Sequence, residues 1–519
     1  MMMLHLKIYR YGLSFYLAGM VLILTGCPSQ KDIERQIQAQ RQGSYEALLR
    51  SSEAESSEGW PVLSGRLSLD ECMETALQNN RDVQAAKVQL LRARGQMSEA
   101  VATALPAASY SASALRNDNS GLATQKETYQ LRLLVRQPLY LGGLTGAAID
   151  AAAVFTYLTQ QQLRQTIHEV QLSVHKKYLA ALLAGELVKV SQQAKFDAQE
   201  HLADTEKKLK YGVGTRFDVL RAEVRVNAIE AELIQRRNDE RLALTSLLDD
   251  LGVSQFSEVE LSDELNYEKF VPTPNKDLYQ AIKQRPELLI GAAMIRLAQD
   301  NIKSEQSGNR PKVYLQGMHQ LDYPGFAANF KDFASGGTSG GIAFDKQWER
   351  TMNAGIVVEW PFFDGFRTDG RVTQAKAEMH HQQIALKKAE QQVQLQVSQA
   401  LLNLESSDQF VQSQRGNVAT AEEALRLARV SYREGTGIGL DIITAESALA
   451  QARSDYSTAV HNHQLAVYNL RWAVGTIGEE GQGEAADQTD SRASASKKEM
   501  DHHPNVSLNP LEQLSESRP

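Results

Sequence analysis

Histidine residues are the first candidates for chemistry in this sequence. His380 stands next to His381, and His461 lies two positions from His463, but both pairs fall in stretches of helical periodicity, where exposed helix residues are the simpler interpretation. The sequence contains no glycine loop ending in Gly-Lys-Ser/Thr, no His-Glu-x-x-His motif and no spaced Cys/His cluster. It therefore predicts that the chain is not an enzyme and binds neither a cofactor nor a metal ion.

One cysteine does stand in a pattern with chemical meaning. An apolar run from Tyr11 to Leu24 follows a basic start and stops at Leu24-Thr25-Gly26-Cys27, and it is short for a membrane-spanning helix. The tetrapeptide resembles a lipobox, the recognition sequence of bacterial lipoprotein signal peptidase, which implies cleavage before Cys27 and acylation of Cys27. Pro28 stands where a retention-type aspartate would be, which implies export to the outer membrane. The alternative is an ordinary membrane anchor with an incidental cysteine.

Composition narrows the class of protein. The net charge is -8, and only 13 prolines and 7% aromatic residues occur, which favours long helices over a sheet-rich globule. No basic patch is dense enough to neutralise a phosphate backbone, so a nucleic-acid partner is excluded. Cys72 has no partner once Cys27 is acylated, and we predict a buried structural thiol there rather than a disulfide.

The middle of the chain is duplicated. Gln137-Pro138-Leu139-Tyr140-Leu141-Gly142-Gly143 returns as Trp360-Pro361-Phe362-Phe363-Asp364-Gly365-Phe366, at a spacing of 223 residues. Upstream the spacing is 205, as between Pro106 and Pro311, so eighteen extra residues must lie between Pro311 and Pro361. The Gly- and Ser-rich stretch around residues 335–341 has the loop composition that such an insertion needs.

Long helices are predicted in both copies. The stretch from about Thr145 to Tyr211 lacks proline, and Asp369 to about Tyr432 is its duplicate. Apolar residues at three- and four-residue spacing give the first stretch one buried stripe, and at 1.5 Å per residue its length is on the order of 100 Å. Glycine clusters end both stretches, and further helices follow from Phe217 to about Leu251 and from Leu440 to about Val474. We predict two long antiparallel helical hairpins, with the glycines at their tips.

Segments with period two precede each long helix. Tyr129–Arg136 has an apolar face and a polar face, its partner Ala108–Ala114 also alternates, and the duplicates are Val313–Gln320 and Met352–Trp360. Strands of about ten residues with apolar outer and polar inner faces build transmembrane β-barrels, and about eight strands are the minimum for closure. Four strands cannot close a barrel. Several copies must share one barrel, or the strands do not span a membrane.

These features divide the chain into five predicted regions. They are a lipoprotein signal peptide (1–26), a lipidated N-terminal tether (27–65), a first repeat (66–270), a second repeat (271–476) and a disordered polar tail (477–519).

The ordered motifs resemble the TolC-like outer-membrane efflux family over roughly residues 66–476. The resemblance rests on Leu67-Ser68-Leu69-Asp70-Glu71, on Ala76-Leu77-Gln78-Asn79-Asn80, on the two Pro-to-Gly turns and on the two glycine tips that precede Asp-Val-Leu and Asp-Ile-Ile. It implies a mainly α, internally duplicated fold with a four-stranded β contribution. Long α-helical hairpins would form a periplasmic α-barrel, and the strands a shared 12-stranded transmembrane β-barrel, in a homotrimer.

The function implied by the resemblance is that of a passive exit duct in the outer membrane. The duct would receive drugs, toxic compounds or metal ions from an inner-membrane pump through a periplasmic adaptor protein. The resemblance places adaptor docking at the glycine tips, namely Gly212, Gly214, Thr215, Gly435, Thr436 and Gly437. It places an aperture at Asp218 and Asp441, although Thr444 replaces a further family aspartate and Gly437 a common arginine. Both aspartates would alternatively cap the helices that follow them.

Two other functions share parts of this pattern. The chain could be the exit duct of a type I protein secretion system, since such systems use the same kind of duct. A non-channel periplasmic coiled-coil adaptor lipoprotein would share the helices and glycine tips, but it would not need the alternating strands before each long helix.

Overall fold

The computed structural model describes residues 61–116, 127–323 and 348–478, the short pieces Arg35, 37–39 and 41–42, and the backbone of two strands at 325–328 and 342–345. The predicted signal peptide, Cys27, most of the tether, the stretch at 335–341 and the tail after Gly478 lie outside these residues. Contacts divide the chain into two compact units. The larger comprises Leu69–Leu251 and Asp263–Pro519, and the smaller comprises Met1–Ser68 and Gly252–Ser262.

The helices of the larger unit form two matched sets. The first set is α3 (Leu69–Asn79), α4 (Arg81–Ala102), α5 (Leu144–Lys210) and α6 (Arg216–Leu251). The second set is α7 (Pro274–Gln284), α8 (Pro286–Gln306), α10 (Arg367–Arg433) and α11 (Gly439–Val474). α7 repeats α3 at a spacing of 205 residues, and α10 and α11 repeat α5 and α6 at 223. The duplication predicted from the sequence is therefore confirmed element by element.

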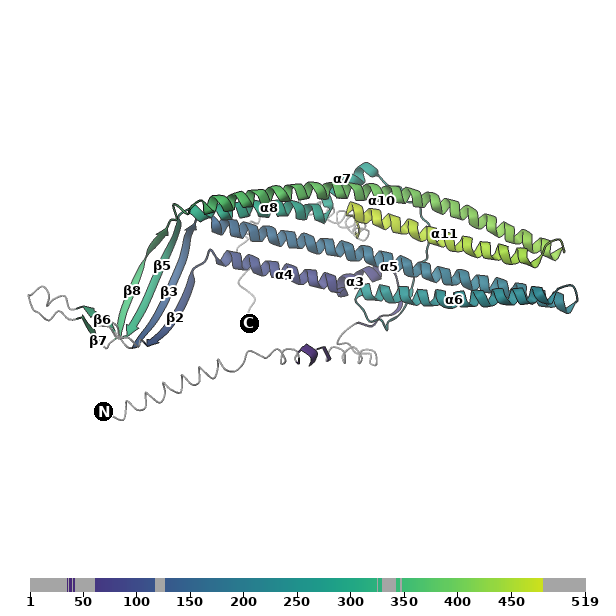
Figure 1. The fold of residues 1–519 in the computed structure, drawn as a ribbon, viewed down its shortest axis with the longest axis horizontal. Coiled ribbons are helices and arrows are strands. Elements are labelled where there is room, and N and C mark those ends of the chain that lie inside the picture. Colours follow the sequence, from purple (N-terminus) through teal and green to yellow (C-terminus); the bar gives the residue numbers. More distant parts are fainter. Residues whose placement is uncertain are drawn as a thin grey trace, which may run out of the picture. The chain divides into compact units, whose positions relative to one another are not determined.

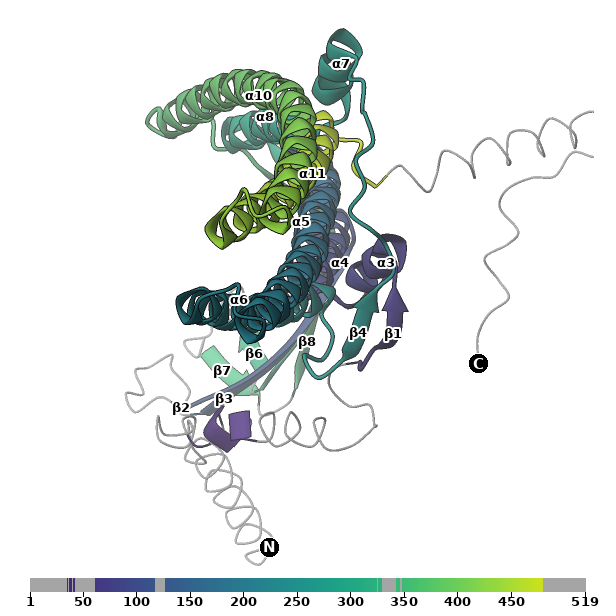
Figure 2. The same cartoon turned by 90° about the vertical axis from the view of Figure 1, so that its right-hand side faces the viewer.

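The two predicted hairpins are also confirmed. α5 packs against α6 and α10 against α11 (Figure 1), with bounds within a few residues of those expected. The shorter helices α4 and α8 were not predicted; α4 lies along α5, and α8 contacts both α5 and α10. Along one half of the unit the helices adjoin in the order α6, α5, α11, α10, and along the other half in the order α4, α5, α8, α10 (Figure 2). No helix in the described part of the chain is both long enough and apolar enough to cross a membrane.

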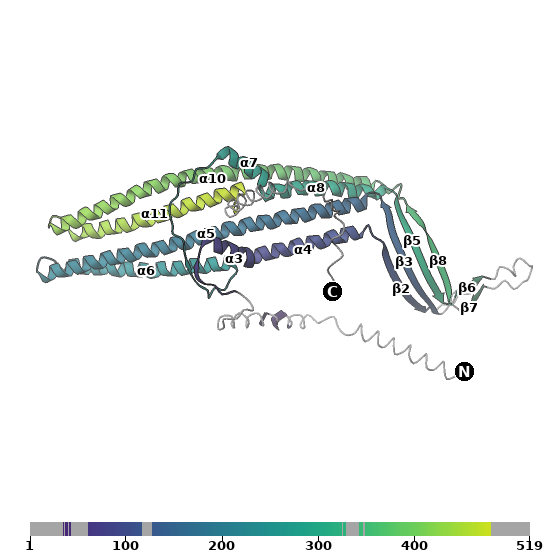
Figure 3. The ribbon, with the colours of Figure 1, turned by 180° about the vertical axis from the view of Figure 1, so that it is seen from behind.

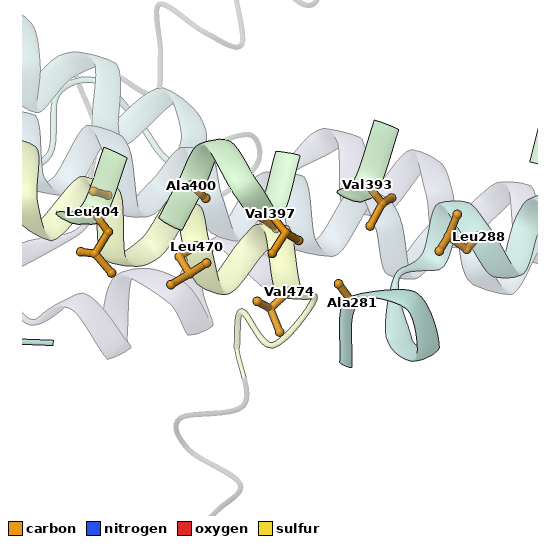
Figure 4. Packing of buried hydrophobic residues seen from close by; sticks show 10 residues of the cluster. Ala281, Leu288, Val393, Val397, Ala400, Leu404, Leu470 and Val474 are labelled. Atoms are coloured by element: carbon orange, nitrogen blue, oxygen red, sulfur yellow. The ribbon is translucent and has the colours of Figure 1, made fainter. Parts of the chain in front are cut away.

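One apolar core joins α7, α8, α10 and α11. Its buried residues are Ala281, Leu288, Val393, Val397, Ala400, Leu404, Ala466, Leu470, Ala473 and Val474. Those from α10 recur every three or four residues, so they form one stripe of the helix. Figure 4 shows this stripe facing Leu470 and Val474 of α11. Each fully buried Leu or Val contributes about 1.5–3 kcal/mol relative to exposure, which makes this stripe a main source of hairpin stability.

A four-stranded antiparallel sheet continues from the helices. It contains β2 (Ala107–Arg116), β3 (Glu127–Leu141), β5 (Lys312–Tyr323) and β8 (Glu349–Glu359), in the order β2-β3-β5-β8 (Figure 3). All four predicted strands are confirmed. The connection from β5 to β8 is longer than that from β2 to β3, and it holds the antiparallel pair β6 (Gly325–Ala328) and β7 (Ile342–Asp345). The extra residues of the second repeat therefore lie in this connection, as predicted.

The smaller unit contains a short parallel pair that the sequence did not reveal. β1 (Ser64–Leu67) pairs with β4 (Glu258–Leu261), and the Ser262 N–H continues the ladder by donating to the Leu67 carbonyl at 3.0 Å. Two strands of four residues, far apart in the sequence, carry too little alternation to be recognised from either segment alone.

Candidate functional site

Each hairpin tip is a turn that depends on two glycines. Gly212 and Gly435 have φ values of +74° and +75°, a region that costs an L side chain about 1–2 kcal/mol. At Gly214 and Gly437 the backbone passes so close to the preceding helical turn that an added Cβ would lie 3.0 Å from an atom of that turn. In the second turn, Thr436 lies between Gly435 and Gly437, and its N–H donates to the Ser431 carbonyl at 3.0 Å. The predicted tip residues thus form two equivalent turns. Their role in docking stays a prediction.

Asp218 and Asp441 occupy the same place in the first turns of α6 and α11. The hydroxyl of Thr215, which precedes α6, accepts from the Asp218 N–H at 3.1 Å and donates to the Asp218 carboxylate. Before α11 the equivalent residue is Ile438, whose N–H donates to the Asp441 carboxylate at 3.3 Å but whose side chain has no oxygen to offer. Both carboxylates are therefore engaged at helix N-termini, which favours capping as their structural role.

Polar contacts that the sequence analysis missed join the two hairpins near their tips. Arg429 of α10 donates to Asp197 of α5 at 3.3 Å and to Glu446 of α11 at 3.2 Å. Lys208 of α5 donates to the Tyr432 carbonyl at 3.1 Å and lies 3.3 Å from the centre of the Tyr432 ring. Burial raises the pKa of the Glu446 carboxyl, and the hydrogen bond from Arg429 opposes this effect. A single charged residue on a long polar helix has no local sequence pattern that predicts such a contact. Only a comparison of positions on two helices that pack together could have indicated it.

The four-stranded sheet has one exposed apolar face. Tyr110 pairs with Leu133, and Ile356 pairs with Leu315, in the register of neighbouring strands. Tyr110, Ile356 and Met352 of this face are 68%, 66% and 79% exposed. Exposed apolar residues on every strand indicate that this face contacts something other than water in the working protein.

The opposite face is polar and carries hydrogen bonds between side chains. Gln130 donates to Asp322 at 2.9 Å, and Arg132 donates to Gln320 at 3.0 Å. Arg136 also lies on this face, since its position in β3 differs from those of Gln130 and Arg132 by an even number of residues. The alternation predicted for Tyr129–Arg136 is confirmed.

Aromatic side chains stand at both ends of the sheet. At the end toward β6 and β7, the Tyr323 ring lies 6.1 Å from that of Tyr129 and 5.4 Å from that of Trp348. At the end toward the helices, the exposed aromatic residues are Tyr140, Trp360, Phe362, Phe363 and Phe366. Girdles of this kind flank the apolar band of transmembrane β-barrels at the membrane interfaces.

Cys72 is buried and unpaired, as predicted. Burial raises the pKa of its thiol to about 12, so the reactive thiolate does not form near neutral pH. Within the described ranges, no group of three or more His, Cys, Asp and Glu side chains is arranged to hold a metal ion.

A comparison with known protein families shows which family this chain belongs to. A family model described as outer membrane efflux protein matches residues 72–253 and 278–476, which hold the two repeats. The chain belongs to this family. The predicted TolC-like resemblance is thereby confirmed, and so is the expectation of a transport component rather than an enzyme.

Individual relatives of the outer membrane efflux family are distant but cover most of the chain. The proteases secretion protein PrtF of Dickeya chrysanthemi is 24% identical over 80% of this chain and 89% of its own. The probable outer membrane lipoprotein SilC of Salmonella typhimurium is 22% identical over 91% of this chain and 99% of its own. A crystal structure of CusC superposes with a TM-score of 0.66 at 19% identity and covers 81% of this chain and 95% of that chain. The mainly α, duplicated fold with four strands is therefore shared with solved members of the family.

Proposed function

We propose that the protein is the passive outer-membrane exit duct of an efflux system and works as a homotrimer. The observation that carries the proposal is the sheet order β2-β3-β5-β8, which among the described residues leaves β2 and β8 as unpaired edges beside an exposed apolar face. An open edge in a membrane is unfavourable, because its backbone groups have no partners there. If β2 of one copy pairs with β8 of the next, three copies close a 12-stranded barrel with a threefold axis.

Exposed apolar residues on the helices support the same assembly. On α10 they include Ile384, Leu395, Leu402 and Leu427, whose separations of 11, 7 and 25 residues are near whole helical turns. On the far side of the larger unit, α4 and α6 expose Val88, Leu91, Leu220, Val224, Ile234 and Leu242. We propose that the α10 face of one copy packs on the α4 and α6 face of the next and closes a helical tunnel in the periplasm.

The tips are the proposed contact with the rest of the machine. The duct has no site for energy conversion among its described residues, so a pump in the inner membrane must drive transport, and a periplasmic adaptor must link the two. Apolar residues at the tips support docking there, since Tyr211, Val213 and Phe217 of one turn and Ile438 of the other are exposed. Docking would involve the tip residues Gly212, Gly214, Thr215, Gly435, Thr436 and Gly437.

Asp218 and Asp441 are the proposed aperture residues, in addition to their hydrogen bonds at the helix starts. Threefold symmetry would bring three copies of each carboxylate around one axis, where divalent cations would bind. The test is the single-channel conductance of Asp441→Ala with and without divalent cations. Loss of cation block supports the aperture, whereas unchanged conductance and unchanged block limit Asp441 to capping.

A lipid anchor at Cys27 is proposed for the mature protein. Diacyl and amide-linked chains together hold a protein in a membrane stably, unlike a single chain. Cys27→Ser should still fractionate with the outer membrane if the barrel forms, but it should lack incorporated palmitate. Release of this variant into the soluble periplasm would instead support the alternative of a coiled-coil adaptor lipoprotein without a barrel.

Small molecules are the proposed substrates, with protein secretion as the second candidate. Small-molecule efflux is supported by the similarity to a protein described as a cation efflux system protein, CusC of Escherichia coli O157:H7, which is 21% identical over 88% of this chain. The second candidate is supported by the similarity to a proteases secretion protein. A deletion strain distinguishes them. Greater sensitivity to drugs or metal ions with an unchanged set of secreted proteins supports efflux, and the reverse result supports secretion.

The assembly itself is tested by the mass of the detergent-extracted protein from light scattering and by its conductance in planar bilayers. A trimer with discrete, sparsely open channels supports the duct. A monomer, or a species that never conducts, contradicts it.

A further inference from the structure

We propose that the polar face of the sheet contains a binding site for anionic groups, formed by Arg132 of each protomer. The site would favour solutes with carboxylate, phosphate or sulfate groups. This inference rests on the proposed barrel, in which the polar face lines the lumen, and it adds a substrate class to that function.

The strand register divides the polar face into rows that cross all four strands. One row contains Ser111, Arg132, Gln320 and Thr351, so Arg132 is the only charged residue in it. The next row toward β6 and β7 contains Ser113, Gln130, Asp322 and Glu349 and is acidic. The following row on the other side contains Ser109, Leu134, Met318 and Asn353 and is uncharged. Rows are about 7 Å apart, since two residues separate them along a strand.

Hydrogen bonds fix the Arg132 side chain through one nitrogen. Its Nε donates to the Gln320 side-chain oxygen at 3.0 Å. The Gln320 amide nitrogen donates in turn to the two Asp322 oxygens at 3.0 and 2.8 Å. Gln130 also donates to Asp322 at 2.9 Å, so the Asp322 carboxylate, one row away from Arg132, is occupied by two neutral amides. Within the described residues, the two terminal nitrogens of Arg132 make no ion pair.

The second arginine of this face differs in its partners. Arg136 donates to Glu359 at 3.2 Å and lies 3.5 Å from the centre of the Tyr314 ring, so its charge is already balanced. Among the described residues, Arg136 has a carboxylate partner and Arg132 has none, so Arg132 is the better candidate to bind an anion. A guanidinium presents its terminal N–H groups as a fork that matches carboxylate and phosphate oxygens, and arginine rings line known anion pores.

In the proposed trimer, threefold symmetry would place three copies of Arg132 in a ring. A 12-stranded barrel is too wide for its side chains to fill, so three Arg132 guanidinium groups would face water at one level of the lumen. A multivalent anion in this ring would contact more than one guanidinium. The ring would slow the passage of such an anion and concentrate singly charged anions.

The test is block of single-channel current by inorganic pyrophosphate, added on either side of a planar bilayer. Arg132→Gln should weaken the block by about tenfold or more, because a hydrogen bond to a charged group contributes more than a neutral one. Arg350→Gln is the matched control, since Arg350 pairs with Leu321 on the apolar face and should leave the block unchanged. Arg136→Gln should have a smaller effect than Arg132→Gln.

The outcomes separate this inference from the duct itself. Equal block of the wild-type protein and Arg132→Gln, or equal weakening by Arg350→Gln, would overturn the anion site while the channel remains. A wild-type protein that forms no channel would contradict both the duct and the site. If Arg132→Gln does not assemble, Arg132→Lys keeps the charge but loses the fork, and an unchanged block in this variant would contradict recognition by the guanidinium.

Discussion

Asn80 and Arg285 stand at equivalent positions of the two repeats, directly before α4 and α8, and both donate to the end of a neighbouring helix. Asn80 donates to the Asp250 carbonyl at 2.8 Å, and Arg285 donates to the Ala473 carbonyl at 3.3 Å. Asp250 and Ala473 are themselves 223 positions apart, the spacing of the duplicated hairpins. The same connection is therefore made in both repeats, once by a short amide and once by a long cation.

The two side chains satisfy their surroundings in different ways. The Asn80 oxygen accepts from the Asp82 N–H at 2.9 Å and so caps α4. Arg285 has no acceptor, and α8 begins instead with a proline, whose nitrogen has no hydrogen to satisfy. Arg285 is 3% exposed, and it donates to Glu287 and Gln396 at 2.6 and 2.7 Å. A buried cation needs several hydrogen-bond partners. Removing Arg285 should therefore lower the stability of the protein more than removing Asn80 does.

Arg285→Ala should have the largest effect on stability, a loss of about 3–5 kcal/mol, because it leaves a partly buried carboxylate unpaired. Burial alone would raise the pKa of Glu287, and the hydrogen bonds from Arg285 hold that pKa below its usual range. The measurement is the thermal loss of helical circular dichroism in detergent. A loss no greater than that of Asn80→Ala would contradict the difference between the repeats.

Acid should destabilise the first repeat through His168, whose equivalent in α10 is Gln391. Burial, and then the nearby Arg164, lower the pKa of His168 from 6.5 to about 4. The unfolded chain binds a proton below about pH 6.5 and the folded chain only near pH 4, so this stability is complete above 6.5 and is lost as pH falls through 4. The contribution is at most about 3 kcal/mol.

His168→Gln should flatten part of the decline in thermal stability between pH 6.5 and 4. Burial also lowers the pKa values of His175, His201, His461 and His463. These four residues should account for the decline in thermal stability that remains in His168→Gln. An identical pH profile for His168→Gln and the wild-type protein would rule out His168 as a source of the acid sensitivity.

Asn80→Ala should cost about 1–2 kcal/mol, since it removes the cap of α4 and one hydrogen bond. Hydrogen exchange should speed up in the first turn of α4, while the equivalent turn of α8 should keep its wild-type rate. Asn79→Ala is the control, because Asn79 bonds to the Thr75 carbonyl within its own helix and does not cap α4. Uniform acceleration in both repeats would argue against a local cap.

Phe366→Gly should stabilise the turn before α10 by about 1 kcal/mol. Phe366 has φ +65° where the first repeat has Gly143, and its ring makes an edge contact with Phe363 at 5.8 Å that offsets part of the gain. The thermal midpoint in detergent checks this. A lower midpoint would mean that the aromatic contact outweighs the backbone strain.

Ile438→Thr should give the smallest effect, a gain of up to about 1 kcal/mol, by supplying α11 with the hydroxyl cap that Thr215 gives α6. Thr215→Ala is the matched variant, and it should remove the hydroxyl cap from α6. Hydrogen exchange at the two tips should change in opposite directions in these variants. Equal behaviour of the two tips would show that the turns do not depend on this cap.

Much of the fold could be predicted from the sequence because its signals are local. The absence of proline and the three- and four-residue apolar spacing predicted α5 and α10, and the glycines at 212 and 435 predicted the tips. Alternation in Tyr129–Arg136 predicted both faces of the sheet. The helices α3, α4, α7 and α8 were missed, although the prolines that open α7 and α8 and the Asn80 cap of α4 were readable signals.

The sequence by itself determined the two hairpins, the four strands and the duplication, because periodicity, glycine and repeat spacing act over a few residues or compare one segment with another. Only the tertiary structure revealed the buried contacts of Arg285, the Arg429 link between hairpins, the pairing of β1 with β4 and the row in which Arg132 is the only charge. Each of these depends on residues separated by many positions, for example the 232 positions between Asp197 and Arg429, and on the register in which elements pack. A polar residue on a helix or strand looks the same in the sequence whether it faces solvent or a partner, so packing alone distinguishes the two.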